Sequence, residues 1–262
     1  MSDVTPPPKN SSNPSDSNFL KSIGFILSKS VELVRQSYHR LFIIAFVQAL
    51  LIRLAMVLFP LPQGAMMGDM ADINAGTVMG LLGLAVIVLL VGAIGNALMQ
   101  ACFVSKIRDQ SARMGEVFNF VFHKAGRLFS ACVIYYSLMT LGMMLYVLPA
   151  VLLGAVFFLY LPSLLFEEEV TALGALKRSW QLTRTKFGIM LVLYIFTSLL
   201  YLLPQLLIQD LNFLNISGAI LNVLMIFAAS LTLPLCNAIC VTTYSYRRLE
   251  IAAKTKPVKT AS

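Results

Sequence analysis

Few residues of this chain could carry chemistry inside a membrane. Arg53 is the only Lys or Arg within a long apolar run. It lies about 12 residues from the basic end of that run, which is roughly 18 Å along a helix. A charge at that depth costs several kcal/mol unless it pairs or reaches the interface. Two interpretations are open: the side chain extends outward toward Asp69 or Asp72, or it forms an intramembrane polar site with Asn96 and Gln100, which are one helical turn apart.

Other reactive side chains do not gather into a catalytic set. Glu167, Glu168 and Glu169 end an apolar run just before an amphipathic segment, where negative charge favours a helix N-terminus. No nucleophile or metal-ligand spacing accompanies them. The sequence therefore predicts neither an enzyme nor a cofactor. The cysteines lie within or at the end of apolar runs, without a CxxC pair, and are interpreted as small apolar side chains: Cys102, Cys132, Cys236 and Cys240.

Composition places the chain in a membrane. It is 58% hydrophobic and only 12% charged, and its mean hydropathy is +0.80. Soluble domains carry about a quarter charged residues, and a spanning helix needs about 20 apolar ones. The sequence therefore predicts an all-α, polytopic membrane helical bundle, with Pro149 separating the third span from the fourth. The six transmembrane helices are expected near 41–61, 77–103, 128–148, 149–166, 187–208 and 216–242.

The basic residues give this bundle an orientation. Of the 20 Lys and Arg, all except Arg53 fall before the first span, after the last, or in the loops 104–127 and 167–186. The charged residues of the loops 62–76 and 209–215 are all Asp. Because Lys and Arg are retained on the cytoplasmic side, we expect a bacterial inner-membrane protein with both termini in the cytoplasm. The net charge of +8 is assigned to anionic headgroups rather than to nucleic acid.

Three amphipathic segments near 19–38, 114–125 and 171–185 each precede a pair of spans, and Thr171 is placed as the N-cap of the third. They indicate three parallel repeats of an interfacial helix plus a helical hairpin. The alternative is that any hairpin flanked by a basic helix looks alike. This membrane domain is expected over 19–250, between a disordered tail at 1–18 and a basic tail at 251–262. Six residues are predicted to contact headgroups at the interface: Arg40, Arg127, Lys177, Arg178, Trp180 and Lys186.

Three segments resemble a known family. SLLFEEEVTALGALKRSWQLTRTKFG at 163–188 is similar to YciC-like bacterial inner-membrane proteins and to the membrane domain of some bacterial glycerophosphodiester phosphodiesterases. ILSKSVELVRQSY at 26–38 and TYSYRRLE at 243–250 fit the same resemblance. It implies a six-span inner-membrane protein without an established activity and supplies no catalytic residues. Phosphodiesterase activity is not expected here.

Two functions remain in view. The first is a non-enzymatic membrane protein that binds lipid through its basic and aromatic interface. In this class, the binding partner is alternatively another membrane protein or a second copy of the chain. The second is a small-solute transporter or channel. The residues that favour the second are polar groups and prolines within the spans: Arg53, Asn96, Gln100, Asn237, Pro162, Pro204 and Pro234.

Overall fold

The computed structural model describes residues 16–59, 75–108, 113–167, 169–210 and 217–255. Within these ranges the chain is helical and contains no strand, and six helical segments are long and apolar enough to cross a membrane. The predicted all-α polytopic bundle is confirmed. The helices are α1 (Asp16–Leu58), α2 (Ala75–Ile107), α3 (Met114–His123), α4 (Ala125–Leu145), α5 (Val147–Phe157), α6 (Tyr160–Phe166), α7 (Ala172–Arg184), α8 (Phe187–Asp210) and α9 (Gly218–Thr255).

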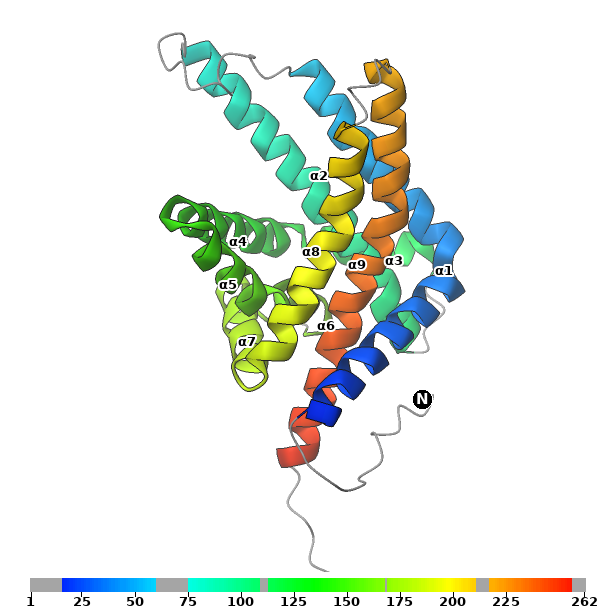
Figure 1. The fold of residues 1–262 in the computed structure, drawn as a ribbon, viewed down its shortest axis with the longest axis vertical. Coiled ribbons are helices and arrows are strands. Elements are labelled where there is room, and N and C mark those ends of the chain that lie inside the picture. The colour runs from blue at the N-terminus through cyan, green and yellow to red at the C-terminus, as the bar shows by residue number, and fades with distance from the viewer. Residues whose placement is uncertain (1–15, 60–74, 109–112, 168, 211–216, 256–262) are drawn as a thin grey trace, which may run out of the picture.

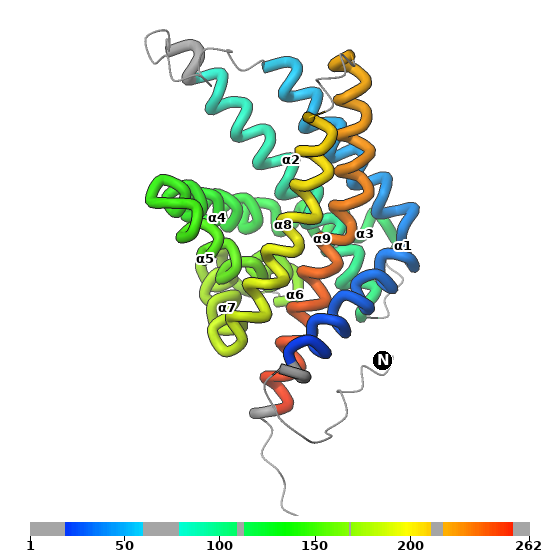
Figure 2. The backbone as a smooth tube through the Cα atoms, in the orientation of Figure 1, coloured from blue at the N-terminus to red at the C-terminus, as the bar shows by residue number. Residues whose placement is uncertain are grey.

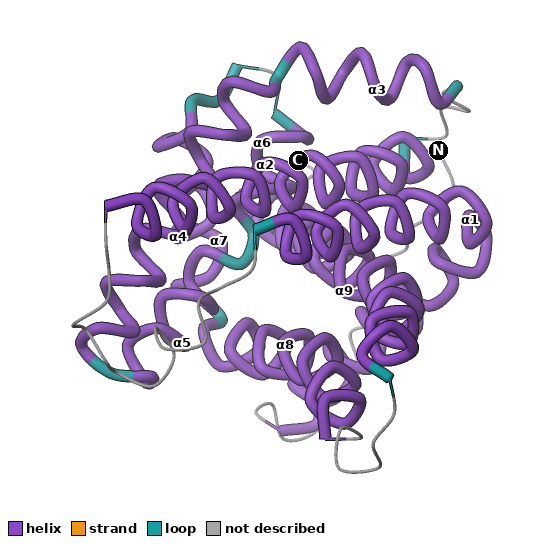
Figure 3. Tube along the Cα trace, turned by 90° about the horizontal axis from the view of Figure 1, so that it is seen from above, coloured by secondary structure: helices purple, strands orange, loops and turns teal. Residues whose placement is uncertain are grey.

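The six long segments form a ring. α1 packs on α2, α4 on α5 and α8 on α9, so each pair is a helical hairpin. Between hairpins, α2 packs on α4, α5 on α8 and α9 on α1, which closes the ring (Figure 3). The start of α1 and the end of α9 lie at the same end of the molecule (Figure 1). This end, which carries most of the Lys and Arg side chains, is called the basic end below. The ring order fits three successive units, while their descent from one ancestral unit stays a prediction.

The first interfacial helix and the first span are one element rather than two. α1 runs unbroken from Asp16 to Leu58 and changes direction along its length (Figure 2). Residues 25–58 contain neither Gly nor Pro, so nothing in the backbone ends the helix between the amphipathic and apolar segments. α9 likewise continues past the predicted end of the sixth span to Thr255. The predicted boundary at 250/251 therefore falls inside a helix.

The second hairpin turns at Tyr146, three residues before Pro149. The backbone amide of Tyr146 donates to the carbonyl of Gly142 at 2.9 Å. Pro149 lies in the first turn of α5, where the missing amide hydrogen costs nothing. A Cβ on Gly142 would lie 2.9 Å from Cα of Ala150, so this glycine permits the close approach of α4 and α5. α4 crosses the long axis of the molecule, which α8 and α9 follow more closely (Figure 1).

The fourth span is divided into α5 and α6, and α7 binds the backbone groups at the break. The Ser179 hydroxyl donates to the carbonyl of Val156 at 2.9 Å and accepts the amide of Leu159 at 3.1 Å. The Thr183 hydroxyl donates to the same carbonyl of Val156. Ser179 and Thr183 are one turn apart, so they share the buried face of α7. The predicted N-cap of α7 is confirmed, because the Thr171 hydroxyl accepts the amide of Gly174 at 3.1 Å.

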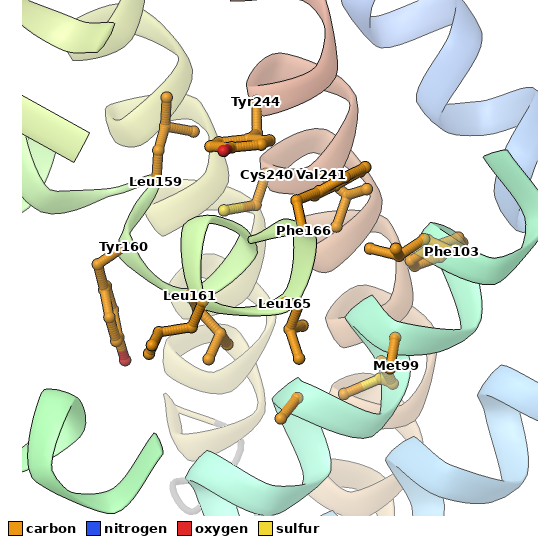
Figure 4. Close-up of a cluster of buried hydrophobic side chains, with 14 of the residues drawn as sticks. Met99, Phe103, Leu159, Tyr160, Leu161, Leu165, Phe166, Cys240, Val241 and Tyr244 are labelled. Atoms are coloured by element: carbon orange, nitrogen blue, oxygen red, sulfur yellow. The ribbon is translucent and has the colours of Figure 1, made fainter. Parts of the chain in front are cut away.

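The centre of the core is α6. Every residue from Tyr160 to Phe166 is buried. Figure 4 shows α6 between Met99 and Phe103 of α2 and Cys240, Val241 and Tyr244 of α9, and the rings of Phe166 and Tyr244 stack with centroids 5.0 Å apart. The tip of the α4–α5 hairpin lies at the side of the molecule (Figure 1) and exposes apolar side chains, including Met144 at 82%. A buried core together with an apolar exposed surface is typical of a helical bundle embedded in lipid.

Candidate functional site

Two of the three predicted intramembrane polar residues lie in one cluster. The Asn237 side-chain amide of α9 donates to the Asn96 carbonyl oxygen at 3.0 Å. The Gln100 amide donates to the Asn237 carbonyl oxygen at 2.9 Å. The Asn237 amide also donates to the backbone carbonyl of Leu233 at 2.9 Å. This amide cluster therefore links α2 to α9. Such bonds inside membranes contribute about 0.6 kcal/mol each on average.

Arg53 lies in a different cluster, on α1, α8 and α9. Its guanidinium donates to the side-chain oxygen of Gln205 at 3.1 Å and approaches the sulfur of Met225 at 2.6 Å. The hydrogen bonds of Arg53 thus do not reach Asn96 or Gln100. The alternative partners Asp69 and Asp72 lie outside the described residues. Sequence spacing left open which helices Arg53 faces.

Gln48 joins the buried polar groups and was not singled out by the sequence analysis. Its side chain lies against α2, because a Cβ on Gly95 would overlap the Gln48 amide. The side-chain oxygens of Gln48 and Gln100 are buried, and neither has a hydrogen-bond partner among the described residues. A buried acceptor without a partner is a place for water or a polar solute. The signal was available, since Gln48 continues the buried stripe of Leu41 and Ala45.

The predicted headgroup contacts divide into two groups. Two of them hold the protein together: Arg178 donates to Glu167 at 3.1 Å, and Lys186 pairs with Glu250 at 3.2 Å. The others are exposed toward solvent or lipid at the basic end, with Trp180 49% exposed. These exposed members, which we call the exposed collar, are Arg40, Arg127, Lys177 and Trp180.

The C-terminal end of α6 gathers several cations. The Lys124 ammonium donates to the carbonyls of Leu164 at 2.9 Å and Glu167 at 3.1 Å. Arg108 donates to the carbonyl of Phe166 at 2.9 Å. A buried helix end needs such donors for its last carbonyls, and cations suit its partial negative charge. The Glu167 carboxylate also accepts the Tyr244 hydroxyl at 2.8 Å. Glu167 therefore links the end of α6 to α7 and α9.

A second buried cation ties α7 to α9. Arg247 is 2% exposed. Its guanidinium donates to the carbonyl of Leu182 at 3.2 and 3.1 Å through two nitrogens, and it also contacts Thr185 and Glu250. Sequence reasoning assigned Arg247 only to membrane orientation, because a charge count does not show which cations the fold buries.

The short helix α3 has two apolar faces, one packed against the core and one exposed on the surface. Val117 and Val121 are buried against the core. Phe118 and Phe122 are exposed and stack with ring centroids 6.2 Å apart. Exposed aromatic rings on a short helix beside the ends of spanning helices are typical of an interfacial segment. α3 therefore has the composition to contact both protein and lipid.

Comparison with known protein families, curated proteins and solved structures finds no match to this chain. The resemblance of residues 163–188 to YciC-like proteins therefore stays a prediction. The structure gives those residues a role in the fold, because Glu167, Arg178 and Ser179 all bind neighbouring segments. The functional argument rests on the geometry described above.

Proposed function

We propose that this integral membrane protein binds anionic lipids at the cytoplasmic face of a bacterial inner membrane and has no catalytic role of its own. In this proposal both termini are cytoplasmic, as the asymmetry of Lys and Arg favours. The observation that carries the proposal is the exposed collar at the basic end. Lys177 and Trp180 are exposed on α7, whereas the neighbouring Arg178 and Lys186 form ion pairs with Glu167 and Glu250.

Physical chemistry supports lipid as the partner of the exposed collar. A basic side chain near an anionic membrane surface gains about 1 kcal/mol, and Trp and Tyr prefer the headgroup level. Trp180 and the exposed pair Phe118 and Phe122 supply the aromatic part. Binding to a partner membrane protein or to a second copy of the chain would use the same surface and is the competing outcome.

The test is lipid retention after reconstitution in nanodiscs of equal phosphatidylglycerol and phosphatidylethanolamine. Native mass spectra should show the anionic lipid enriched severalfold among the lipids that the protein retains. Lys177→Ser combined with Trp180→Ser should lower the enrichment. Asp210→Asn, which removes an exposed charge at the opposite end, should leave it unchanged. Equal retention of both lipids by the unaltered protein would refute the proposal.

The amide cluster favours a second candidate, passage of a small polar solute. The buried, unpartnered oxygens of Gln48 and Gln100 motivate it. Flux of labelled solutes into proteoliposomes should then fall when Asn96 or Asn237 is replaced by Ala. Flux that is unchanged by Asn96→Ala, Asn237→Ala and Arg53→Ala would remove these residues from a transport path.

A further inference from the structure

A cavity of about 350 Å³ opens at the basic end, between α1, the last turns of α2 and the start of α3. Its polar lining comes mainly from the stretch 35–40 of α1 and from Ser105 and Lys106 of α2. Val117 of α3, which is 5% exposed, forms part of its apolar wall. No residue of this cavity belongs to the amide cluster or to the α6 end.

Three permanent cations line this one cavity: Arg35, Arg40 and Lys106. Among the described residues, no acidic side chain lines it and no carboxylate binds any of the three. Four other cations of the basic end, by contrast, each pair with a Glu: Lys29, Arg178, Lys186 and Arg247. Three like charges around one space repel each other, and an anion in that space reverses the sign of the interaction.

The types of side chain favour a phosphoryl group. Arg guanidinium forks match phosphate oxygens bidentately, and Lys binds phosphate as a point charge. The Ser37 side chain, which also lines the cavity, adds a hydroxyl that can donate to a phosphate oxygen. Two arginines, a lysine and a serine thus supply charged and neutral donors from two helices to one open cavity.

Depth and size favour a lipid as the source of that phosphoryl group. Arg40 directly precedes Leu41, a fully buried residue of α1, and Lys106 lies in the last turn of α2. The cavity therefore lies where both spans leave the apolar region, which is the level of headgroup phosphates. Its volume equals that of about a dozen waters at roughly 30 Å³ each, so it exceeds what one phosphate ion fills. On the next turns of α3, Phe118 and Phe122 are exposed at the edge where acyl chains would continue.

We propose that the cavity lined by Arg35, Arg40 and Lys106 is a specific site for the phosphoryl headgroup of one anionic phospholipid. This inference rests on the proposed function and deepens it. The exposed collar, which shares Arg40 with the cavity, attracts anionic lipid in general, whereas the cavity binds one molecule in a saturable manner. A zwitterionic headgroup is disfavoured, because its own ammonium would face the three cations.

The experiment titrates short-chain phosphatidylglycerol into the detergent-solubilised full chain and counts bound lipids by native mass spectrometry. We expect one saturable site. Arg35→Gln and Lys106→Gln should each weaken it about tenfold or more, as the loss of one charge-assisted contact does. Arg35→Lys, which keeps the charge, should weaken it less. Lys21→Gln is the matched control, because Lys21 is an exposed cation on the same helix outside the cavity.

Three outcomes separate the alternatives. If Lys106→Gln, with an unchanged melting temperature, still binds one lipid with full affinity, the cavity assignment is overturned while general anionic enrichment can stand. If inorganic phosphate or glycerol 3-phosphate displaces the lipid at equal concentration, the ligand is a soluble phosphate compound and the lipid assignment is overturned. If the Lys177→Ser, Trp180→Ser variant loses general enrichment but keeps the saturable site, the cavity is confirmed as a site that does not depend on Lys177 and Trp180 of the exposed collar.

Discussion

Lys124→Met is the most informative single change to the fold, because Lys124 caps α6 from within the core. Lys124 is 7% exposed, and its ammonium donates to the carbonyls of Leu164 and Glu167. It also lies 4.7 Å from the centroid of the Phe120 ring. Met keeps most of the apolar stem and removes the charge and its donors.

The expected cost follows from these contacts. Each hydrogen bond from a charged donor contributes about 1.5–3 kcal/mol, and a part of the loss is offset because a buried ammonium no longer needs to be desolvated. Arg108 still caps the carbonyl of Phe166. We therefore expect a net destabilisation of about 3 kcal/mol. For domains of 150–250 residues this corresponds to a melting temperature lower by about 6–12 °C.

The assay is thermal unfolding in detergent, followed with a fluorophore that reacts with newly exposed thiols. Cys132 and Cys240 are buried and free in the native structure, so unfolding makes them reactive. Lys177→Met is the matched control, since Lys177 is exposed and surface substitutions usually stay within about 0.5 kcal/mol. Equal melting temperatures for the two variants would refute the reasoning, because they would show that α6 does not need its buried cap.

Two further predictions concern helix packing. Gly142→Ala should destabilise the α4–α5 hairpin by about 1–3 kcal/mol, because its Cβ would meet the Ala150 backbone; Gly126→Ala, with open space around it, should be neutral or slightly stabilising in the same thermal assay. Asn237→Leu should lower stability by only about 1.2 kcal/mol, because it removes the side-chain bonds to Asn96 and Gln100, which contribute about 0.6 kcal/mol each. A loss above 3 kcal/mol in urea unfolding would contradict that second estimate.

The parts of the fold that depend on local sequence could be predicted from it. The length of the apolar runs predicted six spanning helices, because bilayer thickness sets helix length, and six helical segments are long and apolar enough to cross a membrane. Thr171 was identified as an N-cap, since capping depends on residues adjacent in the chain. The joining of the first interfacial helix to the first span could also have been deduced, because residues 25–58 lack Gly and Pro.

The partners of polar residues could not be predicted in the same way. A charge count treats every Lys and Arg at the basic end alike, yet Lys124 and Arg247 are buried and Lys177 is exposed. That difference depends on which helices pack against each other, and those contacts are set by the arrangement of all the helices in the ring. For the same reason the contacts of Arg53 with Gln205 and Met225 could not be predicted, because they required knowledge that α8 and α9 face it. The cavity beside Arg40 was likewise invisible, because three helices build it.

The closure of the ring by α1 and α9 has a consequence for biogenesis. These two helices pack on each other although they are the farthest apart in sequence among the described helices. α1 is synthesised and inserted into the bilayer first. The face of α1 that α9 covers is therefore exposed to lipid until the intervening helices and α9 have been synthesised. Long-range contacts of this kind slow folding. A chaperone or insertase that shields α1 during translation would therefore protect the protein at its most vulnerable stage, and truncation within α9 would leave the first helix without its main partner.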